Sequence, residues 1–367
     1  MRRMPARVYP PARRLRVTPA ASKRRGELRE AHIDALNLES ERTGERAPDA
    51  ARRAALEAYR LAAHADYGRG MADSLLNQGR LHAHAADYAR ALESFHAAFL
   101  GYQRSGLLDK LPLLQRKLGN IHLVTGQYAK AEACFNRSLA FSRKSGAAGD
   151  EVISLRQLGI VEQFRGRFPA AAARYQEALQ RANAIGDRNQ AANALLDLGS
   201  LRLESGDPGN AMVAYERCRV EWRALGDKIG LAQVSCNMGM ALMQLKRHAE
   251  AERELRAALA TAHASKAARL KLNVLVNLGE LFTASGRADE AGRYLNRGLR
   301  IARLQKDRHI ELGLQLNLAR LTEGRKRIGA ARKQFAAAAI LAGAIGEAEA
   351  LAEARAGLAR LGGASTV

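Results

Sequence analysis

Apolar positions between residues 111 and 146 follow helical spacing twice, and a glycine closes each run. The first run has side chains three or four residues apart, the period of one helix face, and consists of Leu114, Leu118, Ile121 and His122. The second run follows Gly126 and a short turn, and consists of Ala131, Phe135, Leu139 and Phe141. Gly146 then stands where helices commonly end on a left-handed residue. The stretch predicts two antiparallel helices joined by a turn.

This pattern returns every 40 residues, without a slip, from residue 71 to residue 350. A constant period of this length indicates an array in which each unit buries its apolar face against its neighbours. We therefore predict an all-α fold of about seven helix-turn-helix units, with boundaries at 71–110, 111–150, 151–190, 191–230, 231–270, 271–310 and 311–350. A continuous array overrides the two or three domains that length alone would suggest.

One position of the second helix is alanine in every unit, namely Ala91, Ala131, Ala171, Ala211, Ala251, Ala291 and Ala331. We expect so small a side chain where two helices approach too closely for a larger one. Gly119 in the first helix and its equivalents are expected to be small for the same reason, and Ala319 is the one exception.

The order Leu-Gly, Gly, aromatic, Ala, aromatic resembles the tetratricopeptide repeat (TPR) over all seven units. Ordinary TPR units have about 34 residues, and segments such as 184–201 and 224–242 resemble the 40-residue variant. That variant occurs in Leu-Gly-Asn-repeat spindle adaptors, in the sensor half of the bacterial maltose-regulon activator and, more loosely, in Rap-type quorum sensors. The resemblance implies a right-handed α-solenoid that captures a peptide, protein or small ligand in a concave groove.

The two ends of the chain depart from the pattern. Residues 1–26 hold nine Lys or Arg, four prolines and no acidic residue, so we expect a disordered basic arm; a targeting segment and a mis-assigned start site are the alternatives. Residues 27–70 read as two capping helices, the first ending near Gly44 and the second with Leu56, Tyr59, Leu61 and Ala63 on its packing face. Residues 351–367 read as a capping helix and a tail.

The net charge of +22 favours an acidic partner over a basic one. No platform of aromatic and basic residues is present, so we expect no specific nucleic-acid role. No apolar run approaches the ~18 residues that span a bilayer, and we expect a soluble, cytoplasmic protein without a membrane role. Cys134, Cys218 and Cys236 form no CxxC pair and are expected to be buried thiols.

No catalytic motif is recognisable: the sequence contains no Gly-rich phosphate loop, no GxSxG and no HExxH. His82 and His84 are two residues apart and so face different sides of a helix, which makes them, with His96, a poor metal site. We expect no enzyme activity, no cofactor and no metal.

In TPR proteins the concave wall is formed by the first helix, at the two residues before the Leu-Gly pair and the one after it. Asn recurs just before the pair in four units, as Asn77, Asn237, Asn277 and Asn317. A side-chain amide both donates to and accepts from a peptide backbone. These four, with Asn120 and Arg320, are candidate peptide-binding residues.

Arg80, Arg116, Lys117 and Arg156 are expected on the same wall, away from packing faces, as a cationic pocket suited to carboxylates. This set resembles the carboxylate clamp of chaperone-binding TPR domains, whose Lys and Asn positions correspond to Arg116 and Asn120. Gln157 and Asp197 match the rest of the clamp only in part.

Two functions remain. We favour a non-enzymatic scaffold that binds an acidic peptide segment of a partner protein. The alternative is a regulatory module that senses a ligand or peptide and acts on a separate output protein. The sequence leaves open whether the protein is a monomer or a dimer.

Overall fold

The computed structural model describes residues 19–44 and 46–362, and all regular structure in these residues is helical. The predicted residues 1–18 of the basic arm and the tail 363–367 lie outside this part. The chain divides into two compact units, Met1–Ser154 (unit 1) and Leu155–Val367 (unit 2), which we describe separately.

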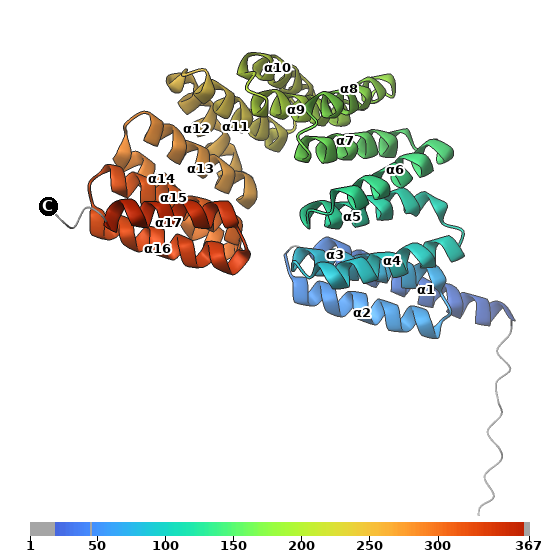
Figure 1. Cartoon of the computed structure of the whole chain (residues 1–367). Coiled ribbons are helices and arrows are strands. Elements are labelled where there is room, and N and C mark those ends of the chain that lie inside the picture. Colours follow the sequence, from blue (N-terminus) through green and yellow to red (C-terminus); the bar gives the residue numbers. More distant parts are fainter. Residues whose placement is uncertain (1–18, 45, 363–367) are drawn as a thin grey trace, which may run out of the picture. The chain divides into compact units, whose positions relative to one another are not determined.

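Unit 1 is built from consecutive helices (Figure 1): α1 (Pro19–Thr43), α2 (Pro48–His64), α3 (Gly68–His84), α4 (Tyr88–Arg104), the 3-10 helix η1 (Leu108–Lys110), α5 (Leu111–Val124) and α6 (Tyr128–Ser145). The unit boundary falls within α7 (Ala148–Phe164). Neighbouring helices pack as pairs, α1 with α2, α3 with α4 and α5 with α6, and α1 also contacts α3.

Unit 2 continues with α8 (Phe168–Ala184), α9 (Arg188–Glu204), α10 (Pro208–Leu225), α11 (Lys228–Gln244), α12 (His248–Ala264), α13 (Ala268–Ala284), α14 (Ala288–Gln305), α15 (Arg308–Gly324), α16 (Ile328–Ile345) and α17 (Ala348–Gly362). The first helices of successive pairs, which we call A helices, touch one another: α9 contacts α11, α11 contacts α13, and α13 contacts α15. The second, or B, helices complete each pair. This all-α fold of stacked helix pairs confirms the prediction.

The 40-residue period is visible in the helix bounds. The B helices begin at Tyr88, Tyr128 and Phe168, and continue at the same interval to Ile328. The interval also extends beyond the predicted array, because α2 begins at Pro48 and α17 at Ala348, each 40 residues from its equivalent. Pairing therefore carries into segments that the sequence pattern alone assigned to caps.

The Leu-Gly pair and the aromatic residue of the B helix form one packing element. A Cβ on Gly119 would lie 2.5 Å from the Phe135 ring, nearer than any real contact, so glycine makes room for the ring. Phe135 is fully buried as a result. Gly159 meets Tyr175 in the same way, whereas Gly239 meets the smaller Leu255.

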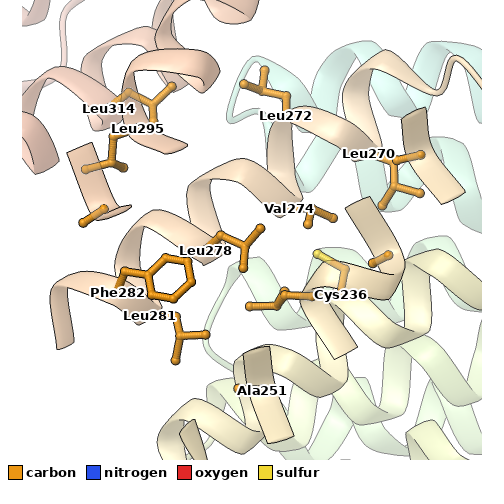
Figure 2. Packing of buried hydrophobic residues seen from close by; sticks show 14 of the residues in the cluster. Cys236, Ala251, Leu270, Leu272, Val274, Leu278, Leu281, Phe282, Leu295 and Leu314 are labelled. Carbon is orange, nitrogen blue, oxygen red and sulfur yellow. The ribbon is translucent and has the colours of Figure 1, made fainter. Parts of the chain in front are cut away.

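The recurring alanines lie at the helix-helix contacts where we expected them, and all seven are fully buried. Cys134, Cys218 and Cys236 are also buried free thiols, as predicted. Figure 2 shows part of the largest such cluster, in which Leu278 and Phe282 of α13 pack with residues of α11, α12, α14 and α15. Burial of these side chains is the main source of stability in each pair.

Turn geometry repeats twice as often as the sequence. Residues with positive φ recur every 20 residues from Asp66 to Gly346, so the turn within a pair and the turn between pairs use the same left-handed residue. Glycine fills most of these positions, including Gly146 with φ 70°, but unit 2 places lysine at four of them, among them Lys306 with φ 56°. The backbone thus imposes a conformation that the side chain at these lysines does not favour.

Two expectations for the N-terminal segment are wrong. Helix α1 begins at Pro19, inside the segment expected to lack regular structure; proline at a helix start loses no hydrogen bond, because the first N–H groups have no partner. In α2 the buried face is a row of alanines, Ala51, Ala54, Ala55, Ala58 and Ala62. Leu56 and Tyr59, which we expected there, are exposed by 43% and 36%, because close packing against α1 and α3 selects the small residues.

One helix in the described residues, α16, has the length and mean hydropathy (1.2) of a candidate membrane span. It contains Arg332 and Lys333, and its Phe335 is buried in a cluster with residues of α15 and α17. Its contacts are those of the other B helices.

Candidate functional site

The A-helix positions around the Leu-Gly pair line one pocket in each unit. The unit 1 pocket has a volume of about 730 Å³, and we call it the cationic pocket. Its described walls come from the end of α1 and the turn after it, from α3, and from α5, with Phe95 from α4: Ser40, Glu41, Arg42, Gly44, Arg46, Asn77, Arg80, Leu81, Ala83, His84, Phe95, Lys117, Asn120 and Ile121.

Four of the predicted site residues, Asn77, Arg80, Lys117 and Asn120, therefore meet in this pocket. Arg80 donates to Glu41 across 2.7 Å, and both side chains are largely exposed. The described lining holds four Arg or Lys side chains and one carboxylate, that of Glu41, so the pocket is electropositive.

Lys117 is the cation that lies deepest by its surroundings. It is half-buried and has no ion-pair or hydrogen-bond partner among the described residues. Its pKa is lowered, first by burial, which disfavours the charged form, and then by the neighbouring Arg80 and Arg116. An anion beside the ammonium group would reverse both effects.

Arg116 does not line the cationic pocket. Its side chain is buried, and Nη2 forms an ion pair with Asp150 at 2.8 Å, while Nη1 is buried without a partner. The expectation that Arg116 lies away from packing surfaces is wrong, because the nearby carboxylate of α7 compensates its charge inside the protein. The clamp-like pair of Arg116 and Asn120 is split between this buried contact and the pocket wall.

The fourth predicted cation, Arg156, belongs to unit 2. It donates through Nε to Asp197 at 2.6 Å and through Nη1 to Gln190 at 3.3 Å, and little of either charged side chain is exposed. Burial raises the pKa of Asp197, and the Arg156 charge opposes that rise. A single pocket that contains all four cations stays a prediction.

The unit 2 pocket has a volume of about 350 Å³ and is lined mainly by amides and apolar groups; we call it the amide pocket. It lies on α11, α13 and α15 and is formed by Gln233, Cys236, Asn237, Met240, Asn273, Val276, Asn277, Glu280, Ile310, Gly313, Leu314 and Asn317. It contains three of the four recurring asparagines. A second hollow of about 430 Å³ shares Asn237 and Met240 with it and adds Gln163, Ser200 and Gln244.

The recurring asparagines are also bonded from one A helix to the preceding one. Asn77 Nδ2 donates to the Asn37 carbonyl at 2.8 Å, and Asn277 Nδ2 donates to Cys236 Sγ at 3.2 Å. Asn237 donates to Ser200 Oγ and Asn317 to Glu280 Oε1, each at 3.3 Å. These side chains thus connect successive repeats, a structural role that the sequence reading did not include.

Arg320 lies outside the amide pocket. Its Nη2 donates to Asn317 Oδ1 at 2.6 Å, and its Nε is 3.4 Å from Glu353, with more than half of the side chain exposed. Within the described residues, no group of three His, Cys, Asp or Glu side chains has the geometry of a metal site.

Sequence reasoning missed Ser40, Arg42 and Arg46, because residues 27–70 had been read as a cap. The signal was present one period before the array: Asn37 stands 40 residues before Asn77, and Ala51 stands 40 residues before Ala91. Applying the period to this segment would have placed Ser40 at the position equivalent to Arg80.

Solved structures similar to this chain are regulators built from helix pairs. Aspartyl phosphate phosphatase F from Bacillus subtilis has a TM-score of 0.62 at 10% identity, over 77% of this chain and 73% of that one. The Rap conjugation gene regulator of plasmid pLS20, in complex with the Phr* peptide, has a TM-score of 0.59 at 13% identity, over 92% and 97%. The apo form of RapI has a TM-score of 0.56 at 13% identity, over 75% and 99%.

At such identities these likenesses concern the fold. None of the curated proteins compared with the sequence matches it. The tetratricopeptide repeat model matches residues 110–184, 150–219 and 230–304, which together make up half of the chain. With the Leu-Gly, alanine and aromatic positions packed as described above, the chain belongs to the tetratricopeptide repeat family.

Proposed function

We propose that this protein is a non-enzymatic scaffold that binds a peptide segment of a partner protein along its A helices. The observation that carries the proposal is the amide pocket, where three asparagines at the same repeat position line one hollow. A ligand with repeating backbone N–H and C=O groups matches such a surface, because each amide both donates and accepts.

The apolar part of the same pocket supports a peptide over a purely polar ligand. Met240, Val276 and Leu314 lie among the amides, and Met240 is 40% exposed. Alternating apolar and amide groups fit the side chains and the backbone of one bound segment.

The acidic character of that segment rests on charge. The chain carries +22, and the cationic pocket places Arg80 and Lys117 beside Asn77 and Asn120. Charge of this kind raises the association rate with acidic partners and favours carboxylates in contact with guanidinium groups.

A sensor that controls a separate output protein is the second candidate. It is favoured by the Rap regulator whose structure contains the Phr* peptide, since that protein shares this fold over most of both chains. The sequence contains neither a P-loop nor a recognisable helix-turn-helix. In either case we propose that the protein acts in the cytoplasm, by binding.

The experiment is capture of partners from extract of the source cells, followed by titration of the captured segment as a synthetic peptide. The double variant Asn237→Leu and Asn277→Leu removes amides from the pocket, and Asn296→Leu on α14 removes one exposed amide as the control. We expect the double variant to lose about tenfold or more in affinity and the control to bind as the parent does. Equal affinities in all three proteins would refute the proposal.

A further inference from the structure

We propose that the cationic pocket of unit 1 binds a small organic anion, made of a compact doubly charged head group on an apolar body. A phosphate monoester and a dicarboxylate share this chemistry. The inference goes beyond peptide binding, because it assigns a second class of ligand to a pocket that the amide pocket does not share.

The head group is specified by the cations. Arg80 and Lys117 come from successive A helices, and Arg42 and Arg46 come from the end of α1 and the turn after it. The one described carboxylate of the lining, Glu41, is already bonded to Arg80. Three positive charges are left over, which is more than a single carboxylate neutralises and suits a dianion.

Lys117 carries the argument for occupancy. An ammonium group that is half-buried without a partner loses hydration and gains nothing in return. Its lowered pKa is the expected result of that position. A bound dianion would supply the missing partner, so part of the cost already present in the free protein would be regained on binding.

Ser40 gives a second, independent observation. Its side chain is 2% exposed at the pocket wall, and its Oγ has no hydrogen-bond partner. A buried hydroxyl without a partner is uncommon in folded proteins. A rotation of this side chain would offer a donor to an anion oxygen in the pocket.

The apolar body is specified by the floor and the size of the pocket. Leu81, Phe95 and Ile121 line it beside the cations. The volume of about 730 Å³ lies in the range of pockets for ligands of drug size and exceeds what an inorganic ion fills. A ligand here would contact α1, α3 and α5 together, and would therefore stabilise unit 1 against unfolding.

The experiment is calorimetric titration of the full chain with phenyl phosphate at physiological salt. Benzylsuccinate tests the dicarboxylate form, inorganic phosphate tests the head group alone, and phenol tests the apolar body alone. We expect one of the two dianions with a body to bind, and both halves to bind at least about tenfold more weakly. The thermal midpoint should rise with the concentration of the binding dianion.

Lys117→Met is the test variant, since it removes the charge while keeping an apolar side chain that a half-buried position accepts. Lys144→Met on α6 removes one exposed charge of unit 1 and is the matched control. We expect a loss of about tenfold or more for the first and less than about twofold for the second. Arg80→Gln, at a partly exposed side chain, is a second test variant that does not depend on the folding of the first.

Proton uptake gives a readout that bulk charge would not produce. Because the Lys117 pKa is lowered in the free protein, an anion that raises it again causes net uptake of protons at alkaline pH, and Lys117→Met abolishes that uptake. Failure of both dianions to bind, equal losses in the two lysine variants, or phenol binding as tightly as phenyl phosphate would each overturn the proposal. Binding of a hexaglutamate peptide but of neither dianion would assign the pocket to the peptide instead.

The two proposals fail separately. The dianion titration contains no peptide, and the variants in the amide pocket leave Lys117 and Arg80 unchanged. Loss of dianion binding with retained peptide binding would refute only this inference, and the reverse would refute only the proposed function.

Discussion

The cationic pocket of unit 1 and the amide pocket of unit 2 are built from the same repeat positions but present different chemistry. In unit 1 these positions carry Arg80, Lys117 and Asn120, and in unit 2 they carry Asn237, Asn277 and Asn317. The repeat decides where a side chain is placed, and the residue at that place decides what it can bind. Two ligand chemistries can therefore coexist on one type of backbone.

Internal carboxylates account for much of the difference. In unit 2, Arg156 is bonded to Asp197, and Arg287 is bonded to both Glu252 and Glu290. In unit 1, Arg116 is compensated by Asp150, but Lys117 has no such partner among the described residues. The density of cations in the sequence therefore overstates the charge that each pocket offers to a ligand.

The largest expected effect tests whether the two units share one packing scaffold. Ala131→Glu in unit 1 and Ala211→Glu in unit 2 each place a carboxylate at a fully buried position between helices. We expect each to destabilise its unit by about 2–4 kcal/mol through overpacking and an unpaired buried charge. Chemical denaturation followed by circular dichroism measures the loss, and an unchanged midpoint in either variant would contradict the shared scaffold.

The next effect separates aromatic from aliphatic repeats. In Gly119→Ala the new Cβ meets the Phe135 ring, and in Gly239→Ala it meets the side chain of Leu255. A buried ring has no room to turn, so we expect a loss of about 1–3 kcal/mol for the first variant. Leucine can change rotamer, so the second should cost less. The thermal midpoints of the two variants, measured together, give the order, and a larger loss for Gly239→Ala would reverse this argument.

Salt dependence distinguishes the two pockets in binding an acidic peptide partner. Arg80→Gln with Lys117→Met should weaken binding about tenfold, or about 1.4 kcal/mol, and should flatten its dependence on ionic strength. Asn237→Leu with Asn277→Leu should weaken binding by a similar factor at every salt concentration. Titration at low, physiological and high salt makes the comparison. Identical salt profiles for the two double variants would show that the pockets do not differ as described.

The smallest effect concerns the left-handed turns. Lys306 has φ 56° after α14, at a position where Gly226 follows α10 with φ 67°. Because glycine adopts this conformation without steric cost, Lys306→Gly should stabilise unit 2 by about 0.5–1 kcal/mol. Gly226→Lys should destabilise it by about as much. Melting curves of both variants provide the test, and a fall in stability for Lys306→Gly would mean that its side chain makes a contact worth more than the strain.

By itself, the sequence determined the fold class, the 40-residue period and the packing positions. These features follow from local rules: apolar spacing specifies helix faces, glycine marks turns, and alanine marks close approaches. They reappear as the buried Ala131 and as the Phe135 ring that Gly119 accommodates. The same rules placed Asn77, Arg80 and Lys117 on one wall before any coordinates were known.

Only the tertiary structure decided which of those side chains face a pocket. Arg116 and Lys117 are adjacent in sequence, yet one is bonded to Asp150 and buried, while the other lines the cationic pocket. Whether a charge is compensated depends on a carboxylate that another helix brings near, and no period in the sequence encodes that distance. For the same reason Ser40 and Arg42 joined the site only when α1 was seen to pack against α3 as an earlier A helix. Helix spacing is a local property of the chain, whereas the partner of a charge is a property of the packed protein.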